Sequence, residues 1–375
     1  MDLATELRFH DRHFVMPKER IQLSEQWGYD ALFGAGDGTG PDSLTPLGYA
    51  AAITSRITLG TCIAKVLART PAATAMAFQT IDQMAGGGRT LIGLGSSDPR
   101  YANGWHVHPW GNPVARMRDY VAILRQIAAG GPVAYKGTEY TIPWAGEGRP
   151  AGPAIRATMD TNPNIPILLG TYGPQMVTLT GEIADGWMPT GFRPGMLEQK
   201  FGKSLEAGFE RADNGKGYGT FQIWAHLDVM VDDDVRTAML PFKQYVCTYP
   251  EFQLPLLAEA GFGEAADKIR DQIEERHGAG SASQYHRPNE GPSFDDPILD
   301  LVPDEYIDGG WLCGPIERFK NLLDPWLSSG ATGLIIRYGA QVPHRGPGVH
   351  YEHLAAFREI ARLLDKPGSD SAFPR

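Results

Sequence analysis

Two aspartates stand at positions where a carboxylate can do acid–base chemistry. Asp37 lies in the Gly-rich loop 34–38, and Asp98 closes the small polar loop 95–98. Each loop follows an apolar segment with the composition of a strand. A carboxylate at the partly desolvated mouth of a barrel can have a raised pKa and act as a general acid or base. The alternative for Asp98, which precedes Pro99, is that it caps a turn or a helix, and Asp37 has a similar alternative.

Two further places could bind an anion. An apolar run at 165–169 leads into the loop 170–173, and Pro174 then opens a helical pattern. Free backbone N–H groups at the start of a helix suit a phosphate, although glycine before a helix is common anyway. Arg193, in the loop after a later strand, could hold an anionic ligand through two guanidinium nitrogens, or it could be a solvated loop residue.

The sequence predicts no metal site. His106 and His108 could pair as ligands on a strand, but no third ligand of fitting spacing stands near them. The glycines of 93–95 are too few for a dinucleotide-binding fingerprint. Several aromatic residues indicate either an aromatic-lined pocket or ordinary core packing. They are Trp105, Trp110, Trp144 and Phe192.

Apolar strand-like segments alternate with amphipathic helical segments along the chain. The expected strands are 7–10, 29–33, 57–60, 90–95, 165–170, 187–190, 221–231 and 331–337. The expected helices are 17–27, 44–54, 71–84, 114–129, 174–184, 194–211, 263–277 and 351–364, and a hairpin is expected at 133–142.

This alternation predicts an α/β protein, a single (β/α)8 TIM barrel that spans residues 1–375. A doubly wound open sheet is the alternative. Residues 232–330, between the seventh and eighth strands, are expected to form a helical and loop insertion. Insertions of such length are typical of lids and binding loops. In a barrel, Asp37 and Asp98 would face the same mouth.

The composition argues against several classes of protein. The 375 residues carry 34 Lys and Arg against 44 Asp and Glu, and the resulting net charge of −10 argues against nucleic acid as a general partner. The three cysteines make neither a disulfide framework nor a metal signature. The sequence has no signal-peptide pattern and no apolar run of membrane-spanning length. We therefore expect a soluble cytoplasmic protein that acts on a small molecule.

Several segments, in their order along the chain, resemble the bacterial luciferase-like superfamily of flavin- and deazaflavin-dependent oxidoreductases. They are 27–33 with Asp37, 55–98, 165–168 with 173–176, 181–187 and, more weakly, 314–319. Members of this superfamily have a (β/α)8 barrel with an insertion between strands seven and eight, and they are commonly dimers. The resemblance thus implies the same fold as the alternation of segments, and it implies a homodimer.

Within the superfamily, residues 60–63 resemble the branch that uses the deazaflavin coenzyme F420. The resemblance implies a cis peptide bond between Cys62 and Ile63, in a bulge behind the deazaflavin ring. It places Asp37 beside that ring. The other residues that it places at the coenzyme are Ser96, Ser97 and Asp98 near the ring, and Thr171, Tyr172 and Gly173 at the phosphate.

The chain departs from the pattern of this branch at three positions. Gly38 stands where many relatives have a histidine, whose role would be vacant here or filled by His10 or His13. Asp98 stands where many relatives have glutamate. Arg193 stands where relatives that oxidise sugar phosphates have a lysine, but the surroundings here are more aromatic, so that substrate is not carried over.

The resulting hypothesis is an F420-dependent oxidoreductase that moves a hydride between C5 of the deazaflavin and a small ketone or alcohol with substantial apolar surface. Asp98, with Asp37, would be catalytic. Arg193, Trp110 and Phe192 would contact the substrate. An FMN-dependent monooxygenase on the same fold is the alternative, and a non-catalytic flavin-binding protein is a third possibility.

Overall fold

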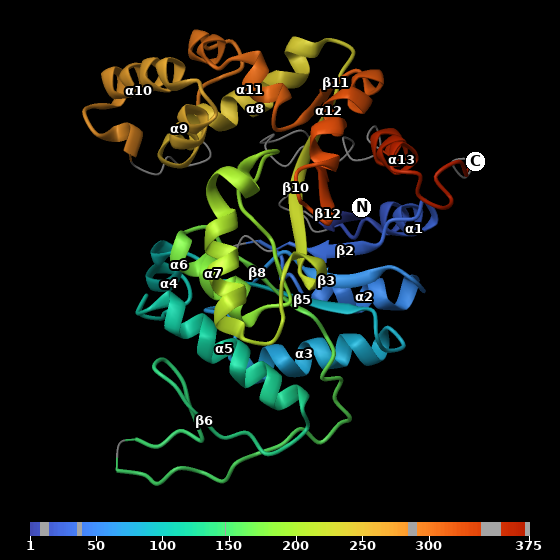
Figure 1. Cartoon of the computed structure of the whole chain (residues 1–375), viewed down its shortest axis with the longest axis vertical. Helices are drawn as coiled ribbons and strands as arrows, with labels where there is room; N and C mark the ends of the chain where they lie inside the picture. Colours follow the sequence, from blue (N-terminus) through green and yellow to red (C-terminus); the bar gives the residue numbers. More distant parts are fainter. Residues whose placement is uncertain (8–14, 36–39, 147, 284–290, 339–353, 372–375) are drawn as a thin grey trace.

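The computed structural model describes residues 1–7, 15–35, 40–146, 148–283, 291–338 and 354–371. In it, parallel strands form a closed barrel with helices outside (Figure 1). The barrel strands are β1 (Asp2–Leu7), β2 (Ala31–Gly34), β3 (Thr58–Thr61), β5 (Thr90–Gly95), β8 (Ile167–Gly170), β9 (Gly186–Trp187), β10 (Gln222–Val231) and β12 (Gly333–Tyr338). They follow one another around the barrel, and pairing of β9 with β10 and of β12 with β1 closes it. The predicted (β/α)8 barrel is therefore confirmed.

Helices cover the outside of this barrel. They are α1 (Lys18–Gln26), α2 (Thr45–Ile53), α3 (Pro71–Met84), α5 (Pro113–Ala128), α6 (Pro174–Ile183), α7 (Gly202–Ala212) and α13 (Leu354–Leu363), with the short α4 (Pro99–Gly104) after β5. Local sequence sets their ends. In α3, the Thr70 hydroxyl accepts a hydrogen bond from the Ala73 amide and Pro71 begins the first turn, so the helix starts where the sequence predicts. The glycines that follow Met84 end it.

The insertion between β10 and β12 is largely helical. It contains α8 (Val235–Thr248), α9 (Pro250–Glu259), α10 (Gly263–His277), α11 (Asp304–Asp308), the short strand β11 (Leu312–Gly314) and α12 (Phe319–Leu327). Figure 1 shows α8 to α11 gathered beyond the end of β10, on the side of the barrel where that long strand projects. At the other end of the molecule in this view, β6 (Tyr135–Lys136) and β7 (Thr141–Ile142) form the predicted antiparallel hairpin.

The first strand differs from the prediction. It covers Asp2–Leu7 rather than 7–10, and residues 8–14 lie outside the described part of the chain. The apolar pattern does not reveal this strand, because it contains the polar residues Thr5 and Glu6. Both are fully or almost fully buried in the folded chain. The sixth strand is also shorter than predicted, and the helix expected at 194–211 begins as a π-helical turn, Leu197–Phe201, before α7.

Two cores fill the molecule, one between strands and helices and one inside the barrel. The inner core is a layer of Ala4, Ala31, Phe33, Cys62, Leu91, Leu168, Met188, Trp224 and Ile335. Side chains alternate along a strand with a period of two. The residues that follow Ala4, Trp224 and Ile335 on the inside are therefore polar. They are Glu6 on β1, His226 and Asp228 on β10, and Arg337 on β12.

Candidate active site at the barrel mouth

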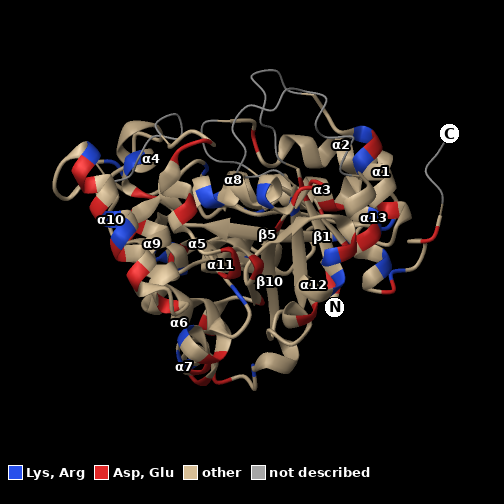
Figure 2. Cartoon of the chain, turned by 90° about the horizontal axis from the view of Figure 1, so that it is seen from above, with Lys and Arg blue, Asp and Glu red and all other residues tan. Residues whose placement is uncertain are grey.

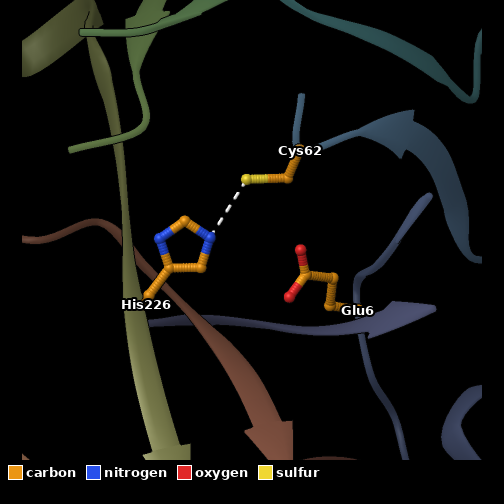
Figure 3. Close-up of side chains that lie close together, drawn as sticks. All are labelled: Glu6, Cys62 and His226. Carbon is orange, nitrogen blue, oxygen red and sulfur yellow. Dashed lines mark hydrogen bonds between the residues drawn. The ribbon is translucent and has the colours of Figure 1, made fainter. Parts of the chain in front are cut away.

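Glu6, His226, Asp228 and Arg337 form a polar group inside the barrel, next to the apolar layer, and Cys62 at the edge of that layer contacts the group. Glu6, Asp228 and Arg337 lie toward the carboxyl ends of their strands, His226 lies near the middle of β10, and Cys62 directly follows β3. The carboxyl end is the one at which barrel enzymes carry their chemistry. Cys62 Sγ lies 3.1 Å from Nε2 of His226, and the Glu6 carboxylate faces the same space (Figure 3). The ligand atoms of Glu6, Cys62 and His226 all lie within 4.8 Å of one another.

An ion cluster adjoins this group. Arg337 Nη2 donates to Asp228 Oδ2 at 2.6 Å, and Arg337 Nε lies 3.9 Å from Glu6 Oε2. Burial alone would lower the pKa of Arg337, but the Asp228 and Glu6 carboxylates raise that pKa above its ordinary value. Arg337 is therefore a fixed positive charge between carboxylates on β1 and β10.

The loop after β3 forms a bulge on the barrel rim. The peptide bond between Cys62 and Ile63 is cis, as predicted. Ile63 packs over glycines of the next two strands. A Cβ atom at Gly95 would lie 2.6 Å from Ile63 Cδ1, and one at Gly170 would lie 2.8 Å from Ile63 Cγ2. Gly95 and Gly170 are register partners of β5 and β8, so two side-chain-free positions make room for one isoleucine.

Asp98 caps a helix. Its side chain accepts a hydrogen bond from the Arg100 amide at 2.9 Å, as the N-cap of α4. Arg100 Nε and Nη2 also donate to the two carboxylate oxygens, each at 3.0 Å. Burial alone would raise the pKa of Asp98, but the hydrogen bonds from Arg100 outweigh it and hold that pKa below its ordinary value. The pKa of Asp98 is therefore lowered and not raised, and the interpretation of Asp98 as a helix cap is confirmed.

The neighbouring serines line the same loop. Ser97 has a left-handed backbone with φ of 68°, which turns the chain between β5 and α4. Its hydroxyl oxygen is buried and has no hydrogen-bond partner within the described part of the chain. The Ser96 hydroxyl donates to the Ser97 carbonyl at 3.3 Å. A buried hydroxyl without a partner is a group that a polar ligand can satisfy.

In the loop between β8 and α6, Thr171 lies in the core and Gly173 lies at the start of the helix. Thr171 is buried, with its hydroxyl 2.8 Å from that of Thr180 and its carbonyl accepting from Trp187 Nε1 at 3.0 Å. The Tyr172 hydroxyl accepts from Lys200 Nζ at 2.7 Å. Gly173 is the N-cap of α6, and no atom lies within 4 Å of the place that a Cβ would take there.

Arg193 is held by the insertion. Its guanidinium carbon lies 3.7 Å from the ring centroid of Tyr306 and 4.2 Å from that of Trp311. Nη1 donates to the Tyr306 carbonyl at 2.7 Å, whereas Nη2 is buried and has no hydrogen-bond partner among the residues described. Burial lowers the pKa of Arg193. The alternative of a solvated loop arginine is therefore wrong.

The two aromatic candidates for substrate contact pack against the protein itself. Phe192 is 4% exposed and meets Trp187 edge to face, with ring centroids 6.0 Å apart. Trp110 is half-buried and packs on the outer core. Asp37, Gly38, His10 and His13 lie outside the described residues.

His106 and His108 do not lie on a strand. Val107 between them has a φ of 51° and is 91% exposed. Burial and the nearby Lys65 lower the pKa of His106. Within the described ranges, the group of potential metal ligands that the structure brings together is Glu6, Cys62 and His226.

Sequence reasoning missed Glu6, His226, Asp228 and Arg337. A signal for three of them was present. His226 and Asp228 interrupt the apolar pattern of a predicted strand at positions two apart, and Arg337 does so near the end of the eighth strand. Polar residues at a period of two within such strands share one face, which is the inside of a barrel.

The luciferase-like monooxygenase family matches the chain over residues 17–333. The chain belongs to this family. It is 31% identical, over 86% of its own length and 90% of the relative's, to a protein of Mycobacterium tuberculosis named as a coenzyme F420-dependent oxidoreductase.

Solved structures with the same fold include two F420-dependent enzymes. The coenzyme F420-dependent tetrahydromethanopterin reductase of Methanopyrus kandleri has a TM-score of 0.69 and 22% identity, with 96% of this chain and 97% of that chain covered. An F420-dependent secondary alcohol dehydrogenase, solved with an F420–acetone adduct, has a TM-score of 0.65 and 16% identity, with 98% of each chain covered. No helix in the described ranges of this luciferase-like protein is long and apolar enough to cross a membrane.

Proposed function

We propose that this protein is a coenzyme F420-dependent oxidoreductase that transfers a hydride between the coenzyme and a small ketone or alcohol. The observation that carries the proposal is the similarity, over nearly the full length of both chains, to a relative named for F420 dependence. The structural likeness to an alcohol dehydrogenase with an acetone adduct supports the substrate class.

The residues present fit such a coenzyme. The unpartnered Ser97 hydroxyl offers a buried polar group at the end of β5. Gly173 leaves open space at the start of α6, where backbone N–H groups favour a phosphate. Ile63, fixed over Gly95 and Gly170, gives a rigid apolar surface between these two places. We propose that Ser96, Ser97, Asp98, Thr171, Tyr172 and Gly173 hold the coenzyme, with Cys62 and Ile63 behind its ring and Asp37 beside it.

When bound, the coenzyme supplies a hydride at C5 of the deazaflavin. The residues of the chain bind the coenzyme and the substrate, orient them toward each other and exclude water from the site. Glu6 and Asp228 are buried and Arg337 bridges them, and we propose that these polar side chains face the reacting atoms. Phe192, Trp110 and Arg193 are proposed to shape the substrate side. Arg193 Nη2, which has no hydrogen-bond partner among the described residues, is the nitrogen there that could donate a hydrogen bond to a ligand.

Parallel titrations of the purified apo-protein with F420 and with FMN test the proposal. We expect tight F420 binding, weak FMN binding and anaerobic turnover of ketones with reduced F420. Tight FMN binding with oxygen consumption by reduced flavin would replace the proposal with a monooxygenase. Binding of F420 without turnover across a panel of ketones and alcohols would indicate a non-catalytic binding protein.

A further inference from the structure

Three side chains of the kinds that bind transition metals meet inside the barrel. Cys62 Sγ lies 3.1 Å from His226 Nε2, and the Glu6 carboxylate faces the same space (Figure 3). One ligand atom from each residue lies within 4.8 Å of the other two. Glu6 and Cys62 are buried and His226 is half-buried, so the three groups meet largely away from solvent.

The register of the barrel places His226 and Glu6 at one level. Alternate strands of a (β/α)8 barrel contribute the side chains of one level, and the tilt of the strands raises that level by about one residue per strand. His226 on β10 is paired with Ile335 of β12, and Ile335 is paired with Ala4 of β1. On β1, two strands from β10, the same level is therefore reached two residues after Ala4, at Glu6.

The same step leads from Glu6 to Cys62. Glu6 is paired with Phe33 of β2, and Phe33 is paired with Gly60 of β3. Two residues after Gly60 the level is reached at Cys62, directly beyond the end of β3. The three side chains therefore meet because the closed barrel holds their strands in this register.

The remaining alternate strand, β8, has a glycine at this level. Leu168 of β8 and Gln222 of β10 are both partners of Gly186 on β9. The step of two residues over two strands, from β8 to β10, then places Gly170 at the level of the three ligands. A Cβ there would lie 2.8 Å from Ile63 Cγ2, so an apolar group covers this side. Among the described residues the level thus offers three potential ligands and an apolar wall.

We propose that Glu6, Cys62 and His226 bind one zinc ion, with a water molecule as its fourth ligand. Thiolate, imidazole and carboxylate are all zinc ligands, and three protein ligands with an exchangeable fourth position are typical of zinc sites that act on small molecules. A thiolate disfavours Mg²⁺ and Ca²⁺, which prefer oxygen ligands. The proposal does not rest on the proposed function, because it concerns the chain without its coenzyme.

The charges of the site balance when zinc is bound. Zinc displaces the proton of the Cys62 thiol to solvent, and no electron is transferred. The thiolate and the Glu6 carboxylate then neutralise the charge of the ion, as a buried place requires. Arg337 and Asp228 are paired with each other at 2.6 Å, whereas Arg337 Nε lies 3.9 Å from Glu6 Oε2. Arg20 meets Glu6 on its backbone side, where Nη2 donates to the carbonyl at 3.2 Å.

Zinc binding is measured on the apo-protein, equilibrated with zinc, dialysed and analysed by mass spectrometry for metals. We expect stoichiometric zinc in the wild type. Cys62→Ser and His226→Gln should each lower zinc affinity by more than about 100-fold, since loss of an outer-shell partner alone costs about 10–100-fold. The controls are His277→Gln, at an exposed position at the end of α10, and Cys247→Ser, in α8. Both should keep the wild-type affinity.

Cobalt(II) in place of zinc identifies the ligands. A thiolate ligand gives cobalt an intense charge-transfer absorption in the near ultraviolet, which we expect in the wild type and not in Cys62→Ser or Cys62→Ala. Zinc should also raise the Tm of the wild type and leave that of Glu6→Gln nearly unchanged, because only a ligand that binds the folded state stabilises it. Circular dichroism of each variant shows that the fold is retained.

Several results would overturn the site. They are a wild type without zinc after dialysis, equal zinc affinity in the wild type, Cys62→Ser and His226→Gln, and tighter binding of Mg²⁺ or Ca²⁺ than of zinc. A loss of zinc in His277→Gln equal to that in His226→Gln would place the metal on the surface instead. Failure of the protein to bind F420 would remove the proposed function alone, since no measurement of zinc or cobalt uses the coenzyme.

Discussion

Asp98 illustrates how one residue's neighbours determine its chemistry. Asp98→Asn should change turnover by less than about tenfold, where loss of a general acid costs about 10²–10⁴. Asparagine caps helices as well as aspartate does, so the unfolding free energy should change by less than about 1 kcal/mol. Steady-state kinetics and urea denaturation measure both quantities. A 100-fold loss of kcat with F420 binding intact would return Asp98 to the catalytic machinery.

Gly170 is the second informative single residue. In Gly170→Ala the new Cβ would lie 2.8 Å from Ile63 Cγ2 and should push the bulge toward the coenzyme side. We expect a weakening of F420 binding by about tenfold or more, with a stability cost of about 1–3 kcal/mol for overpacking. Gly219→Ala is the control, because no atom lies within 4 Å of its Cβ position. Equal F420 affinity in the two variants would show that Ile63 does not position the coenzyme.

At the scale of elements, one buried side chain ties the β6–β7 hairpin to α5. Asp119 is 3% exposed and accepts from the Tyr135 hydroxyl at 2.8 Å, the Glu139 amide at 2.7 Å and the Tyr140 amide at 3.1 Å. Asp119→Ala should lower the unfolding free energy by about 3 kcal/mol and increase amide exchange in the hairpin. The control is Asp267→Ala, which removes an exposed ion pair on α10 and should cost less than about 1 kcal/mol. Equal losses would contradict the anchoring role.

At the scale of the whole molecule, Arg193 joins the barrel to the insertion through Tyr306 and Trp311. Arg193→Met should cost about 2 kcal/mol and increase limited proteolysis within residues 232–330. Arg236→Met is the matched control, since Arg236 is in the insertion and makes an exposed ion pair with Asp300. Identical cleavage of both variants and the wild type would show that Arg193 does not hold the insertion. Figure 2 shows acidic and basic residues interspersed on the outer helices α1, α10 and α13. The chain as a whole has a net charge of −10.

Sequence pattern was sufficient to predict the barrel and most of its strands, although the first strand was placed too far along the chain. Helix starts such as Pro71 and the apolar segment Thr90–Gly95 depend on neighbouring residues, so local pattern is sufficient to predict them. The cis bond after Cys62 came from resemblance to a family and is present.

Which polar residues meet inside the barrel depends on long-range packing. Glu6, Cys62 and His226 come from positions up to 220 residues apart, and they share one layer only because the barrel closes β10 and β12 onto β1. The pKa of Asp98 likewise depends on the rotamer of Arg100, which no pattern of residue types specifies. The sequence leaves Arg193 as either an anion ligand or a solvated loop residue, and only the packing of Tyr306 and Trp311 against its guanidinium excludes the second. The period of two along a strand determines which face of the sheet a side chain occupies. The distances between side chains of different strands inside the barrel follow from closure of the sheet.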